Sequence, residues 1–586
     1  MKRSSTLKQV LHYIKGYKFS IFLSILFATL TVLFSLYIPI IIGDAIDLIV
    51  GADNVDLDGV YSLLSRVGVI TIGIVISQWI MNIINNKIVY NVTKDVRNEA
   101  FDKIQSLPIK YVDGHSYGDV VSRVVSDVDQ FADGLLMGFT QLFTGVMTII
   151  GTLVFMLTIS WQITIVVVVL TPLSLFVASF IAKKTYSMFH IQSKTKAEQT
   201  SIVEEMVGNQ KVVKAFSHED EAIDDFDEVN NRLKKCSVKA IFFSSLVNPT
   251  TRFINALIYA SVALVGAFMV IDNVDLAFSV GALACFLSYA TQYAKPFNEI
   301  SGVVTELQNS FACASRVFEL INEESEDPDT EKDITLENSS GNVSFKNVSF
   351  SYTPEQRLIE NLSLEVKSGQ KIAIVGPTGC GKTTLINLIM RFYDVKDGAI
   401  LIDGHDIRDI TRTSLRKNIG MVLQDTWIRN ATIHENIAIG NPAATRDEVI
   451  KAAKLSHAHG FIKRLPRGYD TIVNESSSTL SQGQKQLISI ARVMLLSPSI
   501  LILDEATSSI DTRTEIKIQE AFATLMENRT SFIVAHRLST IKEADTILVM
   551  RDGNIVEMGN HNDLIKKEGF YYKLYNSQFG AMEESL

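Results

Sequence analysis

The sequence has little cysteine for its length, with four in 586 residues. Cys236, Cys285, Cys313 and Cys380 show no paired spacing, so the sequence indicates neither a disulfide framework nor a zinc site. An excess of basic residues is also absent, because the formal net charge is −9. This balance gives no reason to expect a nucleic-acid partner. A chain of 586 residues is too long for one core and predicts two or more domains.

Charge is missing from several long stretches in the first half of the chain. No Asp, Glu, Lys, Arg or His occurs in residues 19–43, 67–86, 135–182, 253–271 or 276–294. A helix that crosses a bilayer needs about 20 apolar residues, and buried helices of a soluble core rarely lack charge for so long. The run 135–182 has room for two helices with a turn near residues 160–162. The sequence therefore predicts six spans, at about residues 19–49, 60–87, 135–159, 162–183, 240–271 and 275–300.

Basic residues predict the orientation of these spans. Lys2, Arg3, Lys8, Lys15 and Lys18 precede the first one, whereas the short loops 51–59 and 272–275 contain aspartates and neither Lys nor Arg. Because positive residues are retained on the cytosolic side, we expect a cell-membrane protein with both termini in the cytosol. The leading segment has no cleavage pattern, and its first apolar run is too long for a signal peptide.

Two connections between the spans are unusually long. Residues 87–134 and 183–239 are mostly polar, and the second contains one glycine and no proline. So few helix breakers favour helices that continue beyond the membrane into the cytosol over ordinary loops. We thus expect an all-α polytopic membrane domain over residues 1–325.

The character of the chain changes after this domain. "NEESEDPDTEKD", residues 322–333, is acidic and contains proline, and we interpret residues 326–340 as a linker. "NVSFKNVSF" then alternates apolar and polar residues as a half-buried strand does. The short apolar segments "KIAIVG", "SILILDE" and "SFIVAHR" each precede a helical pattern. Residues 341–586 are therefore predicted to form an α/β domain.

The strongest motif of this domain is "GPTGCGKTT", which follows a predicted strand and opens a helix. Glycines let successive backbone N–H groups converge on phosphate oxygens, and the helix N-terminus adds partial positive charge. Lys382 can reach the β- and γ-phosphates, and the Thr383 hydroxyl can ligate Mg²⁺. The candidate ATP contacts are Gly376, Pro377, Thr378, Gly379, Cys380, Gly381, Lys382, Thr383 and Thr384.

Two further segments supply candidate catalytic groups. In "LILDE", Asp504 fits a Mg²⁺-associated carboxylate, and Glu505 fits a base that polarises the attacking water. His536 ends the strand "SFIVAH". A lone histidine is as often structural as functional, so His536 carries no assignment from the residues alone.

The ordered series "GPTGCGKT", "VLQDT", "LSQGQKQ", "LILDE", "SSID" and "VAHR" resembles the nucleotide-binding domain of ABC transporters. Six spans followed by such a domain resemble a half-transporter of the exporter fold, over essentially the whole chain. Residues 107–131 are similar to the first cytoplasmic loop of these exporters, whose turn touches the ATPase domain.

The resemblance implies a role for each matching residue. Tyr352 would stack on adenine, and Gln424 would sense Mg²⁺ and the nucleophilic water. His536 would hold the γ-phosphate, and Asp511 would reach across a dimer. Mg²⁺ would be held by Thr383, Gln424 and Asp504. The signature residues facing a nucleotide on the opposite subunit would be Ser481, Gln482, Gly483 and Gln484.

The signature segment departs from the family pattern. Asn474, Ser477 and Gln482 stand where glycines are usual, which would stiffen the loop and crowd its approach to the γ-phosphate. The hydrolytic residues, by contrast, match a competent ATPase. We therefore favour a heterodimer with one catalytic and one degenerate site over a homodimer with two equal sites.

The resemblance also implies the activity, which is ATP-driven export of an amphipathic substrate, drug-like or lipid-like. A homodimeric exporter of peptides or lipids and an importer built on the same fold share every motif. Gln292 and Lys295 on the last span are candidate substrate contacts, although Lys295 can equally extend toward the cytosolic surface.

Overall fold

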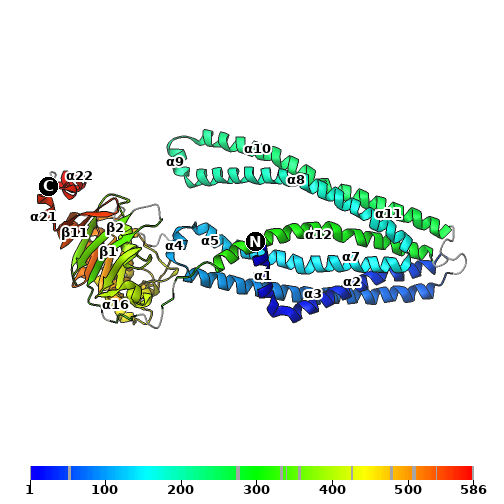
Figure 1. Cartoon of the computed structure of the whole chain (residues 1–586), viewed down its shortest axis with the longest axis horizontal. Helices are drawn as coiled ribbons and strands as arrows, with labels where there is room; N and C mark the ends of the chain where they lie inside the picture. Colours follow the sequence, from blue (N-terminus) through cyan, green and yellow to red (C-terminus); the bar gives the residue numbers. More distant parts are fainter. Residues whose placement is uncertain are drawn as a thin grey trace. The chain divides into compact units, whose positions relative to one another are not determined.

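The computed structural model of the protein describes residues 2–50, 55–271, 278–326, 328–329, 334–337, 339–353, 358–423, 426–474, 480–504, 510–535 and 538–583. The chain divides into two compact units. The first comprises residues 1–106 and 116–324, and the second comprises residues 107–115 and 325–586. The first unit is built of helices, and the strands belong to the second (Figure 1). This is the predicted fold class.

The helices of the first unit are long and follow one another with short breaks (Figure 1). They are α1 (Lys2–Ile14), α2 (Lys18–Asp47), α3 (Leu57–Ser106), α5 (Tyr117–Val124), α6 (Ser126–Met137), the π-helical turn η2 (Gly138–Leu142), α7 (Phe143–Ile159), α8 (Trp161–Gly208), α9 (Gln210–Ala215), α10 (Glu219–Ser245), α11 (Val247–Ile271) and α12 (Val280–Ile321).

Within the described part of the chain, four helical segments are long and apolar enough to cross a membrane. They are Thr6–Asp47, Leu57–Ser106, Tyr117–Ile159 and Glu219–Ile271, and a shorter apolar segment is Trp161–Pro172. The turn predicted near residue 160 is present, because α7 ends at Ile159 and Ser160 is extended, with φ −155° and ψ 117°.

Several helices continue well beyond their apolar segments, as predicted. The 50 residues of α3 form one helix. At 1.5 Å per residue α3 is about 75 Å long, more than twice the thickness of about 30 Å of a hydrocarbon core. Helices α8 and α10 pack along each other and are joined at their far end by α9 (Figure 1). The polar connections of the sequence are therefore helical extensions rather than loops.

Close packing of α2 on α12 depends on a pair of glycines. A Cβ atom on Gly281 would lie 2.1 Å from the carbonyl oxygen of Gly43, and one on Gly43 would lie 2.7 Å from the carbonyl oxygen of Gly281. Small residues allow helix backbones to approach closely in a membrane protein. The Asp47 carboxylate also accepts a hydrogen bond from the Gly281 N–H at 2.7 Å, which satisfies an N–H of the first turn of α12.

The second unit is built on two main sheets. One has the order β2-β1-β4-β5 and is antiparallel, and the other has the order β12-β11-β3-β10-β9-β6. Strands β11, β3, β10, β9 and β6 run parallel to one another, and the edge strand β12 pairs with β11 in the antiparallel direction. The strands are β1 (Val343–Phe350), β2 (Ile359–Val366), β3 (Lys371–Val375), β4 (Asp397–Ile402), β5 (His405–Asp406), β6 (Ile419–Val422), β9 (Ile500–Asp504), β10 (Thr530–Val534), β11 (Thr546–Arg551) and β12 (Asn554–Gly559), with a small pair β7 (Ala431–Thr432) and β8 (Ile472–Val473).

The second unit also contains helices. They are α4 (Ile109–Asp113), α13 (Lys382–Ile389), α14 (Arg412–Lys417), α15 (Ile433–Ile437), α16 (Arg446–Leu455), α17 (His459–Ile462), α18 (Gln482–Leu496), α19 (Thr512–Met526), α20 (Leu538–Lys542), α21 (His561–Lys566) and α22 (Phe570–Glu583). Most of them lie between the strands in sequence, whereas α4 precedes all of the strands and α21 and α22 follow them. The predicted half-buried strand is β1, and the three predicted apolar strands are β3, β9 and β10.

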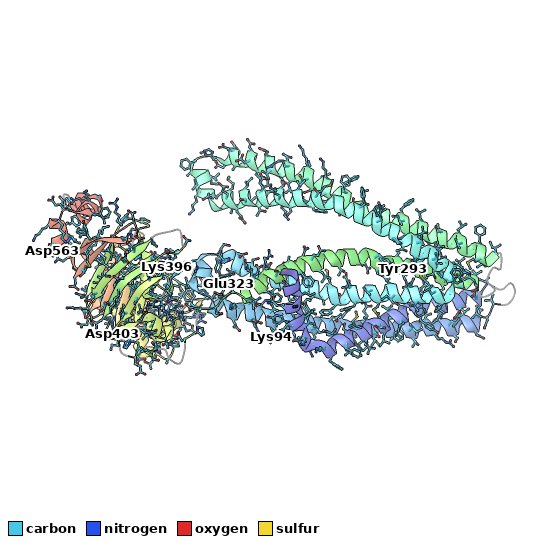
Figure 2. The ribbon with its side chains drawn as sticks, in the orientation of Figure 1. Lys94, Tyr293, Glu323, Lys396, Asp403 and Asp563 are labelled. Carbon is cyan, nitrogen blue, oxygen red and sulfur yellow. The ribbon has the colours of Figure 1, made fainter. Side chains whose placement is uncertain are left out.

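Asp403, labelled in Figure 2, fixes the beginning of this unit to its first sheet. Its carboxylate accepts hydrogen bonds from the backbone N–H groups of Ser340 at 2.8 Å and Asn342 at 3.0 Å. Burial alone would raise the pKa of the Asp403 carboxyl, but the hydrogen bonds from the serine hydroxyls and the backbone lower it to about 2. Residues 339–342 are thereby held against the turn between β4 and β5.

Candidate ATP site

The P-loop connects β3 to α13 and uses glycine for its backbone conformation. Gly379 and Gly381 have φ values of 81° and 99°, in the left-handed region that side chains disfavour. Gly381 is also the N-cap of α13, so the loop ends in the first turn of the helix. Backbone N–H groups of such a turn point toward a bound anion, and the helix dipole adds to the attraction.

Glycine is required at position 376 for a different reason, because there is no space for a side chain. A Cβ atom at this position would lie 2.3 Å from the carbonyl oxygen of Met550 and 2.7 Å from the Cys380 Sγ. Cys380 is 3% exposed, and burial raises the pKa of its thiol. Cys380 therefore packs inside the loop rather than facing solvent.

The Lys382 ammonium lies over the P-loop. Its Nζ donates hydrogen bonds to the carbonyl oxygens of Gly376 at 2.8 Å and Pro377 at 3.0 Å. A phosphate that enters the loop can replace these neutral acceptors with charged ones, which form stronger hydrogen bonds. Thr383 is exposed beside it, whereas Thr384 is buried.

Tyr352 lies beside the N-terminal half of α13. Its hydroxyl donates to Thr384 Oγ1 at 3.1 Å and accepts from Asn387 Nδ2 at 3.4 Å. Its ring meets those of Phe350 and Tyr393 edge to face, with centroids 5.0 Å apart in each case. The structure thus brings this aromatic ring to the helix that the P-loop opens, and its stacking on adenine stays a prediction.

The remaining predicted ATP-site residues follow parallel strands at one edge of the sheet. The P-loop follows β3, and Asp504 is the last residue of β9. Gln424, Glu505 and His536 come one or two residues after β6, β9 and β10 and lie outside the described residues. Because β3, β10, β9 and β6 are parallel neighbours, these chain segments leave the sheet at the same edge. Ligands of open α/β sheets bind outside the carboxyl ends of the strands.

The signature segment is the N-terminus of α18. Ser481 caps this helix: its Oγ accepts from the Gln484 N–H at 3.3 Å, and its own N–H donates to Gln484 Oε1 at 3.0 Å. In this reciprocal capping box, the polar groups of Ser481 and Gln484 satisfy each other within the first turn of the helix. Gly483 is buried, and a Cβ there would lie 2.5 Å from Thr514 Cγ2 on α19.

The structure shows the backbone at two of the three positions where the family pattern has glycine. Gln482 occupies the first position of α18, and neither it nor Asn474 has a positive φ. Ser477 lies outside the described residues. The backbone therefore tolerates a non-glycine residue at positions 474 and 482, and both side chains are exposed. The predicted crowding of the γ-phosphate stays a prediction.

Asp511 is the N-cap of α19. Its carboxylate accepts a hydrogen bond from the Thr514 N–H at 3.0 Å, and this interaction lowers the pKa of Asp511. The side chain is exposed. Asp511 is predicted to contact the partner subunit of a dimer. To do so, its carboxylate would have to give up this capping hydrogen bond and bind a group of the partner.

The sequence did not reveal how the first cytoplasmic turn attaches to the ATPase domain. Helix α4 belongs to the second unit, and the Tyr393 hydroxyl donates to Asp113 Oδ2 at 2.5 Å. Burial raises the pKa of Tyr393, and the hydrogen bond to Asp113 raises it further. The predicted contact of residues 107–131 with the ATPase domain is thus confirmed, while Tyr393 lies in "RFYDV", which carries no recognisable motif.

Comparisons with known proteins agree with this architecture. The family described as ABC transporter transmembrane region matches residues 21–297, and the family described as ABC transporter matches residues 359–508. The solved structure of a bacterial Atm1-family ABC exporter with ATP bound is similar over 97% of this chain and 98% of that one, with a TM-score of 0.78 and 28% identity.

Curated relatives are similar over most of their length. A fatty acid ABC transporter ATP-binding/permease protein of Mycobacterium bovis is 41% identical over 90% of this chain and 83% of its own. A putative multidrug export ATP-binding/permease protein of Staphylococcus aureus is 36% identical over 98% of this chain and 100% of its own.

Fold and site together define a membrane transporter that hydrolyses ATP. More particularly, the chain belongs to the ABC transporter family, with the transmembrane and ATP-binding domains of an exporter fused in one polypeptide. Exporters of this family act as dimers, so the chain supplies one half of a transporter.

Proposed function

We propose that the protein exports an amphipathic, lipid-like or drug-like substrate, using ATP hydrolysed between its own P-loop and the signature of a second half-transporter. The observation that carries this proposal is the placement of the P-loop and Asp504 at one edge of a parallel sheet, in a chain that also holds long apolar helices. The names of the relatives support a lipid or drug substrate, since they are described as fatty acid and multidrug transporters.

The residues present fit ATP and Mg²⁺. The P-loop cradle has no space for a Cβ at Gly376, and Lys382 lies over it, as a phosphate site requires. Thr383, Gln424 and Asp504 would offer oxygen ligands, the type that Mg²⁺ prefers. Bound Mg²⁺ would neutralise charge on the β- and γ-phosphates. Tyr352 would stack on the base, and the signature residues Ser481, Gln482, Gly483 and Gln484 would face the partner's nucleotide.

Hydrolysis is phosphoryl transfer to water, in which the protein positions groups and stabilises charge. Glu505 would polarise the attacking water, and His536 would orient it against the γ-phosphate. ATP binding would close two ATPase domains, and the contact between Tyr393 and Asp113 is a route by which α4 follows that closure. Such coupling needs ATP to bind the closed state more tightly than the open one.

We further propose a heterodimer in which this chain supplies the catalytic carboxylate. Its own signature, with the exposed Gln482 side chain, would close over the partner's nucleotide in a slower site. The alternatives are a homodimer with two equal sites and an importer of the same fold. In all of them the basic N-terminal segment supports a cytosolic location of the ATPase domain and of both termini.

The test is turnover of the chain alone and together with a candidate partner, each with and without Glu505→Gln. Expected is low ATPase activity alone, high activity with the partner, and loss of that activity in the variant. Robust turnover by the isolated chain, abolished in Glu505→Gln, would establish the homodimer. Accumulation of lipids or dyes in inside-out vesicles measures export directly, and depletion of the substrate from them would indicate an importer.

A further inference from the structure

The helical unit contains an open cavity of about 760 Å³ with both polar and apolar side chains in its lining. Its lining comes from α2, α3, the segment from α6 through η2 to α7, and α12. Small-molecule sites have volumes of about 300–1,000 Å³, so this cavity can hold the head of an amphiphile. Nothing in the predicted ATP chemistry uses it.

Five of the residues that line the cavity carry amide side chains. Gln78, Asn82 and Asn86 are four residues apart on α3 and therefore share one face of that helix. Gln141 joins them from η2, and Gln292 from α12. Among the described residues, none of these five amide groups has a hydrogen-bond partner. Polar groups without partners are costly at membrane depth, so these amides are available to water and to a ligand.

The wall formed by η2 and α7 presents acceptors rather than donors. The hydroxyls of Thr140, Thr144 and Thr148 donate to backbone carbonyls one turn earlier, at 2.7, 2.7 and 2.8 Å. Their donors are therefore already used. Gln141 lies in a π-helical turn, a distortion that is frequent at functional sites. The free donors of the cavity are consequently the amide N–H groups and one lysine.

Lys295 is the one cation among the residues that line the cavity. Its Nζ lies 3.8 Å from Glu299 Oε1, and the two side chains are 75% and 52% exposed. A lysine placed before a glutamate is the weaker order of an i,i+4 pair, and exposed pairs contribute little. An incoming anion can therefore replace Glu299 beside Lys295.

Lys295 is about 22 Å along α12 from the first residue of the helix, Val280. With the cytosolic termini of the proposed function, this distance would place the cavity in the inner half of a hydrocarbon core of about 30 Å. Tyr293, labelled in Figure 2, marks the buried face of the same helix and packs against Phe297 with ring centroids 5.2 Å apart. Burial of that face directs Gln292 and Lys295 to the cavity.

We propose that this cavity binds the head group of a long-chain carboxylate, with Lys295 as its counter-ion and the amides as hydrogen-bond donors. The proposal rests on the proposed export function. Lys295 offers one positive charge to one negative charge once the ligand has replaced Glu299 beside it. A phosphomonoester carries about two charges and is best bound by arginine, which the lining does not contain. A cationic head would favour aromatic faces, and the residues that line the cavity include none.

The test is binding of three radiolabelled probes to the purified full-length protein: palmitate, hexadecanol and hexadecyltrimethylammonium. We expect palmitate to bind about tenfold more tightly than the alcohol, which corresponds to about 1.4 kcal/mol, and the ammonium to bind most weakly. Lys295→Gln should abolish the preference and Lys295→Arg should keep it. Glu299→Gln should strengthen palmitate binding, since a competing carboxylate is removed.

Lys18→Gln is the matched control, because Lys18 is an exposed lysine at the start of α2 that does not line the cavity. It should bind all probes as the wild type does. Equal affinity of the wild type for palmitate and hexadecanol, tighter binding of the ammonium, or an unchanged preference in Lys295→Gln would overturn the proposal. The first two outcomes are measured on the wild-type protein. The test therefore remains decisive even if a variant misfolds.

Transport separates this inference from the proposed function. ATP-driven movement of other amphiphiles without any charge preference would leave the export function standing and refute the carboxylate site. Lys295-dependent binding of palmitate without ATP-driven movement of any amphiphile would support the carboxylate site and refute the export function.

Discussion

The P-loop and the signature segment are both helix N-termini predicted to face a nucleotide, yet they use glycine differently. In the P-loop, Gly379 and Gly381 take left-handed backbone conformations and Gly376 has no space for a side chain. In the signature, Gln482 is the first residue of α18 and its backbone is not left-handed. A conformational requirement for glycine thus has to be established position by position.

The largest expected effect is on nucleotide binding by the P-loop. Lys382→Ala should weaken ATP affinity about a thousandfold, or about 4 kcal/mol, since it removes charged hydrogen bonds to the phosphates. Fluorescent-nucleotide titration measures it, with the exposed Lys396→Ala of the same unit as control. Equal losses in the two variants would show that this loop is not the phosphate site.

Gly376→Ala should destabilise the ATPase unit by about 3 kcal/mol, because its Cβ would meet a backbone oxygen that cannot move aside. Gly379→Ala is the matched variant. A Cβ there has nothing within 4 Å, so only backbone strain of about 1 kcal/mol is expected. Thermal unfolding with and without ATP measures both. An equal loss of stability in the two variants would contradict the inference that lack of space restricts position 376 and backbone conformation restricts position 379.

Gly483→Ala should cost about 2 kcal/mol through overpacking against α19. The nearest atom to the added Cβ would be Thr514 Cγ2, at 2.5 Å. Thr514→Ser removes that methyl group and should restore most of the stability in the double variant. If denaturant unfolding shows the double variant to be no more stable than Gly483→Ala, then a contact other than the one with Thr514 excludes a side chain at position 483.

Ser481→Ala should reduce stability by about 1 kcal/mol, the usual effect of removing an N-cap. Asp511→Ala removes the corresponding cap of α19 and serves for comparison. Similar values in urea unfolding are expected. A much larger effect at Ser481 in the isolated chain would show that its hydroxyl has a structural role beyond the capping box.

Gln482→Gly should change stability least, by less than about 1 kcal/mol, because the backbone at this position is already relaxed. If the glutamine side chain obstructs the partner's nucleotide, the variant should raise ATP turnover of the complex while leaving the isolated chain unchanged. Unaltered turnover of the complex would remove the structural support for asymmetric sites. Gln482→Asn, which keeps a polar side chain, is the control.

Much of the fold and of the ATP site could be predicted because the signals are local. An uncharged run of spanning length predicts a membrane helix, and glycines with lysine after a strand predict a phosphate loop. The strands β3, β9 and β10 and the turn at Ser160 are where those signals placed them. The bond between Tyr393 and Asp113 could not be predicted, because it joins residues nearly 300 positions apart that carry no motif.

By itself, the sequence determined that the chain crosses a membrane and hydrolyses ATP, since both properties depend on short segments with their own chemistry. Tertiary structure decided what those segments could not. It gave Gln482 a helical backbone where a glycine position had been expected, and it placed α3, η2 and α12 so that scattered amides and Lys295 share one cavity. Contacts between distant residues depend on how helices pack, and packing follows from complementary shapes that no single segment encodes.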